Sequence, residues 1–211
     1  MKTEDLIRAM AADTRRPPRI GEILPLALAV TTAIAAAGFL SLLGIRPDFA
    51  QAVQYTDTQI KHVFPIVLAA GAFVLSTRLA RPGAQPGAAL VVLALAPVLI
   101  LGALGVEMRT QPAARWADHA FVPSMWTCIV SIPVISAPIL AGSLWALRGG
   151  ASVRPALSGA VAGLLSGGTG AAVYAFYCNQ DSPFYFVLWY PLAIAFVALV
   201  GAGLGARYLR W

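Results

Sequence analysis

Charge is scarce in this chain of 211 residues: only 11% are Asp, Glu, Lys or Arg, whereas 59% are hydrophobic. An ordinary soluble domain carries about twice that share of charge. The chain also has only two cysteines and two histidines, and it contains no CxxC pair, no HExxH pair and no phosphate-binding glycine loop. These absences argue against most enzymatic chemistry, and we expect no enzymatic activity.

The apolar residues are concentrated in long runs, and a helix that crosses the hydrocarbon layer of a membrane needs about 20 such residues. So short a chain could not hide six helices of this kind in a soluble core. The sequence therefore predicts an all-α, polytopic membrane protein with six transmembrane helices. The predicted spans are roughly 23–43, 62–78, 88–106, 121–147, 156–177 and 184–206.

The second predicted span is the shortest. Its fully apolar part runs only from Val63 to Thr77. It crosses the membrane only if the side chains of Lys61 and Arg78 extend outward to opposite interfaces. No Asp, Glu, Lys or Arg otherwise falls clearly inside a span, although ion-coupled transporters usually place ionisable groups there.

The basic residues are distributed unevenly. Eleven of the fifteen Lys and Arg residues fall at the N-terminus or in segments that six crossings place on the same side. Both termini are therefore predicted to face the cytoplasm. The net charge of +6 is explained by this topology, and we expect no direct contact with nucleic acid. The predicted domains are a cytoplasmic segment at 1–22, a transmembrane domain at 23–206 and a cytoplasmic tail at 207–211.

The opening stretch MKTEDLIRAM predicts a short amphipathic helix. Thr3 can cap its start, and the acidic side chains of Glu4 and Asp5 favour the positive end of the helix dipole. The following RRPP cannot continue the helix. Three apolar residues share one stripe of this helix: Leu6, Ile7 and Met10.

Side chains that bind metals or react with oxidants gather at the predicted outer ends of the spans. A cysteine inside a membrane helix can simply be a small apolar filler, and the alternatives are a disulfide, a thiol sensor or a metal site. A disulfide needs Cα atoms within about 7 Å, which requires the fourth and fifth spans to be neighbours. Their short connecting loop favours this arrangement. For the histidines, a role as ordinary interfacial residues is the simpler interpretation. The thiols are Cys128 and Cys178, and the candidate auxiliary ligands are His119, His62 and Asp181.

The fifth span carries Gly159, Gly163 and Gly167 at the spacing that lets two helices approach closely. This pattern favours packing within one chain over a dimer interface.

Several segments occur together in a combination that resembles the NrsF family of bacterial inner-membrane proteins, which are negative regulators of a sigma factor. The resemblance covers essentially the whole chain, and its most specific parts are the N-terminal block and CNQDSP…LWYPLAI. The segments that carry it are MKTEDLIRAMAAD, GIRPDF, RLARPG, the cysteine entering the fourth span, YAFYCNQDSPFYFVLWYPLAIA and RYLRW.

The resemblance implies an anti-sigma factor that holds an extracytoplasmic-function sigma factor at the inner membrane and releases it under oxidative or metal stress. The paired cysteines of the family would correspond to Cys128 and Cys178. The stretch from Thr3 to Met10 would present its stripe and its acidic residues to the sigma factor. No cofactor is expected beyond a metal ion at the two cysteines, and whether the pair binds metal or forms a disulfide stays open.

Two other functional classes remain as alternatives. A small transporter or channel for a metal or an organic solute would need polar or ionisable side chains around a cavity in the middle of the membrane. A membrane thiol oxidoreductase would cycle Cys128 and Cys178 against a quinone, although such proteins normally use CxxC pairs.

Overall fold

The computed structural model describes residues 3–12, 20–81, 87–150 and 152–210, and within these ranges it contains helices and no strand. Six helices are long and apolar enough to cross a membrane, which confirms the predicted all-α fold with six spans. In chain order the elements are α1 (Thr3–Ala12), α2 (Ile20–Leu43), α3 (Phe49–Ala52), α4 (Thr56–Leu79), α5 (Ala88–Thr110), the 3₁₀ turn η1 (Ala113–Arg115), α6 (Trp116–Ala120), α7 (Met125–Leu147), α8 (Pro155–Ala175) and α9 (Pro183–Tyr208).

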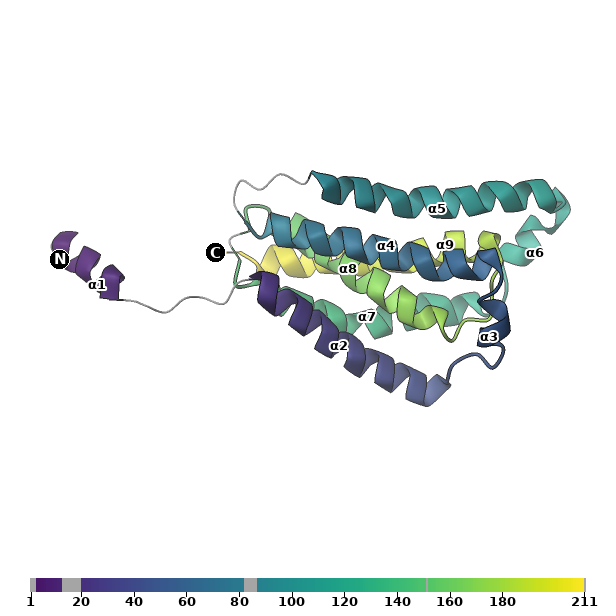
Figure 1. Ribbon diagram of the computed structural model, residues 1–211, viewed down its shortest axis with the longest axis horizontal. Coiled ribbons are helices and arrows are strands. Elements are labelled where there is room, and N and C mark those ends of the chain that lie inside the picture. The colour runs from purple at the N-terminus through teal and green to yellow at the C-terminus, as the bar shows by residue number, and fades with distance from the viewer. Residues whose placement is uncertain (1–2, 13–19, 82–86, 151, 211) are drawn as a thin grey trace.

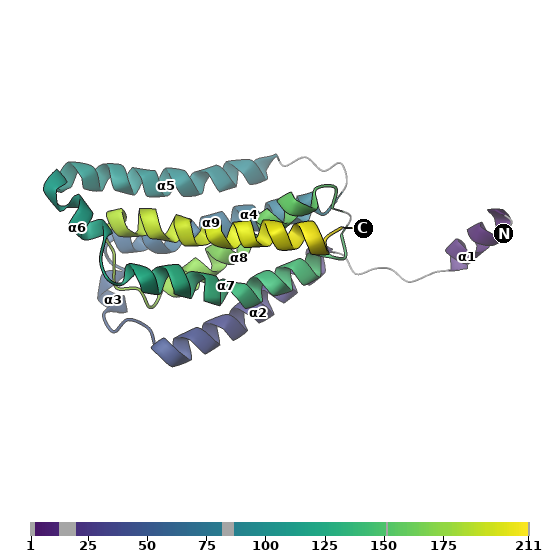
Figure 2. The same ribbon diagram turned by 180° about the vertical axis from the view of Figure 1, so that it is seen from behind.

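The six long helices form one bundle with α8 at its centre. Helix α8 packs against α9, α4 and α7. At the periphery, α5 packs against α4 and α9, whereas α2 packs mainly against α7 (Figures 1 and 2). The short elements α3, η1 and α6 lie at the end of the bundle opposite the start of α2 and the end of α9. We call this the distal end.

The contact between α8 and α9 is a glycine seam in which the two backbones touch. A Cβ atom on Gly163 would lie 2.6 Å from the Val197 carbonyl oxygen, and one on Gly159 would collide with the carbonyl of Gly201. On Gly167 a Cβ would lie 3.1 Å from the side chain of Ile194. The three glycines of the fifth span therefore serve packing within the chain, as their spacing predicted.

Helix α4 corrects the prediction for the second span. It begins at Thr56, earlier than the predicted start at residue 62, so Lys61 lies in its second turn. An acidic residue in the first turn, Asp57, favours this earlier start. The Lys61 side chain does not extend outward to an interface: it is fully buried and points into the bundle. The expectation that no cation lies inside a span was therefore wrong for this residue.

Other helix ends differ from the predicted spans by a few residues. Helix α7 begins at Met125, later than the predicted start at residue 121. Helix α9 holds the chain on both sides of the intervening residues: the Tyr185 hydroxyl donates to Ser124 O at 3.0 Å and Trp189 Nε1 donates to Ala120 O at 2.7 Å. Helix α8 ends at Ala175, two residues before the predicted end. Helix α2 begins at Ile20 and α9 continues to Tyr208.

The N-terminal stretch is helical, as predicted, and α1 has its two acidic residues in the first turn. Thr3, Glu4, Asp5 and Ile7 are exposed, and Ile7 exposes 61% of its surface. The side chains of Leu6 and Met10, and the RRPP stretch, lie outside the part of the chain that the structure describes.

Candidate functional site

The two cysteines lie at the distal end of the bundle, in one buried cluster. Cys128 is in the first turn of α7 and Cys178 follows α8, with exposed fractions of 0% and 3%. Helices α7 and α8 pack against each other, which meets the condition set for the pair from the sequence. Both thiols are free in this structure, and they belong to the same buried cluster.

Aromatic side chains enclose the pair. Tyr174, Tyr185 and Tyr190 are buried in the same cluster, together with Phe64 and Phe186. The Tyr174 and Tyr190 rings lie 5.8 Å apart at a tilt of 58°, a spacing typical of favourable aromatic pairs. The thiols thus sit among buried aromatic side chains and are largely screened from bulk water.

An ionic cluster made of Arg46, Asp48, Lys61 and Asp181 closes this end of the bundle. The Arg46 guanidinium binds Asp48 through two parallel hydrogen bonds of 2.8 Å, and it also donates to both carboxylate oxygens of Asp181, at 2.7 and 2.8 Å. Planar bidentate pairs of this kind are among the strongest polar contacts in proteins. Two cations face two anions, so the ionic cluster carries no net charge.

The pKa values of Arg46 and Asp48, which lie in the loop outside the long helices, reflect this pairing. The hydrogen-bonded Asp48 carboxylate raises the pKa of Arg46 above its usual value, even though burial alone would lower it. In return, the Arg46 guanidinium holds the pKa of the Asp48 carboxyl below its usual range. Both side chains are therefore charged at neutral pH.

Lys61 is the most deeply buried member of the ionic cluster. Its ammonium group donates to Asp181 Oδ1, to the carbonyl of Cys178 at 2.7 Å and to the carbonyl of Gln180 at 3.3 Å. An ammonium group has three protons to donate, and all three have a partner here. A fully buried cation is tolerated because its charge is paired and its hydrogen bonds are complete.

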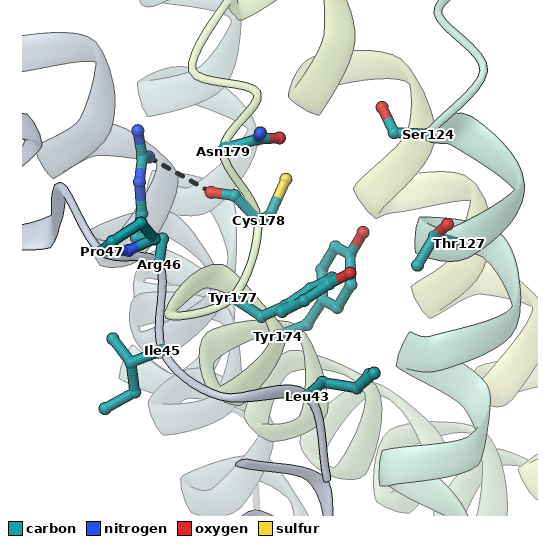
Figure 3. Close-up of a pocket in the computed structure, with 10 residues that line it drawn as sticks. All are labelled: Leu43, Ile45, Arg46, Pro47, Ser124, Thr127, Tyr174, Tyr177, Cys178 and Asn179. Atoms are coloured by element: carbon teal, nitrogen blue, oxygen red, sulfur yellow. Dashed lines mark hydrogen bonds between the residues drawn. The ribbon is translucent and has the colours of Figure 1, made fainter.

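The ionic cluster fixes the backbone of Cys178. Its carbonyl oxygen accepts from Lys61 Nζ at 2.7 Å and from Arg46 at 3.2 Å, so α4 and the loop after α2 both hold this one residue. Figure 3 shows the carbonyl turned toward Arg46 and the sulfur turned the other way, toward α7. The Cys178 thiol is thus oriented by contacts to its own main chain.

A cavity of about 220 Å³ lies on the sulfur side of Cys178. It is bordered by the end of α2, the start of α7 and the end of α8 (Figure 3). Four residues that carry hydroxyl groups line it, namely Tyr174, Tyr177, Ser124 and Thr127, and Cys128 is not among the lining residues. The Ser124 hydroxyl is buried and has no hydrogen-bond partner among the described residues.

The predicted auxiliary ligands do not join the thiols in a metal-binding group. His62 Nδ1 is 2.7 Å from the carbonyl of Thr58, and its ring contacts Phe49 and Phe176. His119 stacks on Phe184, and Asp181 is held by Arg46 and Lys61. Within the described ranges, no group of three or more His, Cys, Asp or Glu side chains could hold a metal ion.

Sequence reasoning missed the two cations of this site. Lys61 was assigned to an interface, and Arg46 was counted only toward topology. A usable signal existed, because TDTQIKH can begin a helix at Thr56 and so bring Lys61 inside it. The sequence near Arg46 and Lys61 does not indicate that both side chains have partners in the loop at 178–181.

A larger cavity of about 750 Å³ opens between α2, α4 and α8. Its walls are apolar apart from Thr32 and Thr169, and no ionisable residue lines it. A transporter was expected to show polar or ionisable side chains in such a place, so this cavity gives that alternative no support.

Fold and site together define a class: a helical bundle of six potential membrane spans that carries a buried thiol pair beneath an ionic cluster. Comparison with known proteins then identifies the family. A family model described as negative regulator of sigma F matches residues 9–211. The chain belongs to this NrsF family, as its sequence segments indicated.

Two relatives match over the full length of both chains. The anti-sigma-F factor NrsF of Caulobacter vibrioides is 34% identical over 218 aligned residues. The probable anti-sigma-F factor NrsF of Azospira oryzae is 33% identical over 214. No solved structure matches the chain.

Proposed function

We propose that this protein is an anti-sigma factor of the bacterial inner membrane that sequesters an extracytoplasmic-function sigma factor and releases it when Cys128 and Cys178 sense an oxidant or a metal. The observation that carries the proposal is the full-length similarity to two anti-sigma-F factors, in a chain with six helices able to span a membrane. The protein acts by holding a partner, not as an enzyme.

The sigma factor is held at the cytoplasmic face by α1. Supporting this, α1 exposes Ile7 and its acidic residues, Glu4 and Asp5, which are free to contact a partner. Acidic side chains complement the basic surfaces with which a sigma factor contacts promoter DNA. The excess of Lys and Arg on the side of the termini supports a cytoplasmic location for α1.

Release requires that the thiols favour one of two states of the bundle, because a signal shifts an equilibrium only by interacting differently with its two states. Cys178 is connected directly to α8, and α8 packs along α9, α4 and α7. A bond formed at either thiol changes the packing at the distal end of these helices. The ionic cluster ties the same residue to α4 and to the loop after α2, so a displacement of Cys178 acts on five of the six long helices.

Deletion of residues 1–12 tests how the sigma factor is held. We expect the sigma factor to leave the membrane fraction and its target promoters to become active without any stress. Ile7→Asp should weaken membrane retention of the sigma factor, because it places a charge on the contact stripe. Val53→Asp is the matched control, since Val53 is an exposed apolar residue of the distal end. Unchanged retention after the deletion would disprove the role of α1.

The sensing step is tested separately with Cys128→Ser and Cys178→Ser. Both variants should retain the sigma factor in unstressed cells and should fail to release it on treatment with peroxide or cadmium. A wild-type response in both variants would exclude the thiols as the sensor while leaving sequestration by α1 intact.

The thiol oxidoreductase alternative has its own assay. Purified protein that transferred disulfides in a quinone-dependent reaction would support it over the sensor.

A further inference from the structure

Both thiols are almost completely buried, but only Cys178 can be reached from the cavity. Cys178 lines the cavity of about 220 Å³, and its sulfur points into that space together with the hydroxyls of Tyr174 and Tyr177 (Figure 3). Cys128 is 0% exposed and does not line this cavity, whereas its neighbour Thr127 does. A molecule that enters the cavity therefore meets Cys178 and not Cys128.

The size and lining of the cavity favour the binding of a small, uncharged molecule. Its lining offers hydroxyl groups and the Asn179 amide, and both cations of the ionic cluster are already paired with carboxylates. Its volume is that of several water molecules, since one water occupies about 30 Å³. Hydrogen peroxide has the required size, neutrality and hydrogen-bonding groups.

A metal ion fits this cavity less well. Cys178 is the only Cys, His, Asp or Glu among its lining residues, and the described part of the chain holds no group of three such ligands. A soft metal ion would find one thiol there, whereas most protein metal sites use three or four ligands.

We propose that Cys178 is the thiol that a hydroperoxide reaches first, through this cavity, and that Cys128 is the resolving thiol. The inference rests on the thiol-sensing part of the proposed function and adds an order of events to it. In the first step the Cys178 sulfur attacks one peroxide oxygen, an S–O bond forms and the O–O bond breaks. The thiol proton leaves with the other oxygen as water or an alcohol, and Cys178 becomes a sulfenic acid.

In the second step the Cys128 sulfur attacks the oxidised sulfur of Cys178. An S–S bond forms, the S–O bond breaks, and the leaving hydroxide takes the Cys128 proton as water. The pair is oxidised by two electrons and the hydroperoxide is reduced by two. The hydrogen bonds from Lys61 and Arg46 to the Cys178 carbonyl keep the Cys178 sulfur facing the cavity for the first step.

The order is tested on purified full-length protein in detergent, treated with hydrogen peroxide and a dimedone-type probe of sulfenic acids, with mass spectrometry of each thiol. In Cys128→Ser, Cys178 should accumulate the adduct, because its resolving partner is missing. In Cys178→Ser, Cys128 should be labelled at least about tenfold more slowly, since oxidation follows access. Equal rates, faster labelling of Cys128, or no adduct in either variant would overturn the proposal.

A second pair of variants tests the cavity itself in the Cys128→Ser background. Thr127→Phe places a ring in the cavity and should slow labelling of Cys178, whereas Val130→Phe, at another exposed position of α7, should not. Helical content by circular dichroism confirms that both variants fold. Equal labelling rates in the two would mean that the oxidant uses another route.

These measurements need no sigma factor. If the predicted labelling order holds but both cysteine variants release the sigma factor normally in cells, the sensing function fails and the order of oxidation stands. If release depends on the cysteines but the labelling order is reversed, only this inference fails.

Discussion

Helices α8 and α2 both end beside the cavity at Cys178, and their surroundings differ more than those of any other two spans. Of the most apolar 18-residue stretch, 67% is buried in α8 and only 6% in α2. Helix α8 has glycine backbone against α9 and further contacts with α4 and α7. Helix α2 contacts chiefly α7, and its Gly38 has nothing within 4 Å of a Cβ position.

The difference shows how the site is assembled. The thiol is attached to the most tightly packed helix of the bundle, and a peripheral helix contributes a single cation, Arg46, through the loop that follows it. Tight packing fixes where Cys178 lies, while polar contacts fix how it is turned. Substitutions in the seam should therefore affect the whole bundle, and substitutions in the ionic cluster should affect its distal end.

The largest effect is expected from Gly159→Ala. The added Cβ would collide with the Gly201 carbonyl, so α8 and α9 must separate. Overpacking of this kind costs about 1–3 kcal/mol, and here we expect the upper end because the obstacle is backbone and cannot rotate away. The measurement is the midpoint of thermal unfolding in detergent.

Gly203→Ala and Gly38→Ala are the matched controls, since nothing lies within 4 Å of a Cβ at either position. Both should be neutral or stabilising by up to about 1 kcal/mol, because alanine is the better helix former. If Gly159→Ala behaved like these two, α8 and α9 would not be in backbone contact.

A smaller and more local effect is expected from Lys61→Met. It leaves Asp181 with one cation, Arg46, and leaves the Cys178 carbonyl with one donor. Breaking a buried ion pair costs about 3–5 kcal/mol, and we expect a loss below this range because Arg46 remains and Asp181 is partly exposed. Unfolding in detergent measures the loss, and hydrogen exchange of residues 176–182 should rise more than that of the seam.

The double variant Lys61→Met with Asp181→Asn supplies the control. It removes one positive and one negative charge, so it should be less destabilised than the sum of the two single variants. Additive losses would mean that the two side chains do not interact.

The smallest expected effect is a change in folding stability at acidic pH, through Asp48. Because the pKa of Asp48 is lowered in the folded protein, its pairing with Arg46 stabilises the fold above the unfolded-state pKa of about 4 and is lost as the pH falls through the lower folded-state value. About half of the Asp48 side chain is exposed, so solvent screening keeps the contribution small.

Asp48→Asn should therefore be slightly less stable than the wild type at pH 7, and the two should converge as the pH drops below about 4. Thermal unfolding midpoints across this range measure the difference. A constant gap between the two proteins at every pH would show that Asp48 does not titrate with folding.

Much of the fold could be predicted because it rests on local patterns. A run of about 20 apolar residues is recognisable without knowing its neighbours, and six such runs became six long helices. The spacing of Gly159, Gly163 and Gly167 likewise revealed a close helix contact, although not which helix provides it. The two cysteines could be singled out because they are rare, and α1 because its acidic start and apolar stripe lie close together.

The direction of a long side chain could not be predicted in the same way. Lys61 can reach outward or inward from the same position, and the choice depends on a carboxylate 120 residues away. Arg46 joins Asp181 across 135 residues. No local pattern reports such a partner, and so the ionic cluster emerged only from the folded chain.

The sequence by itself determined the six apolar helices, the position of the two thiols near helix ends and the membership of the NrsF family, because each is written in composition, periodicity or a distinctive segment. Only the tertiary structure decided that Lys61 is buried, that Lys61 and Arg46 both donate hydrogen bonds to the Cys178 carbonyl, and that a cavity opens onto one thiol and not the other. Those features depend on groups brought together from α2, α4, α7 and α8, and their energies exist only once these helices are packed.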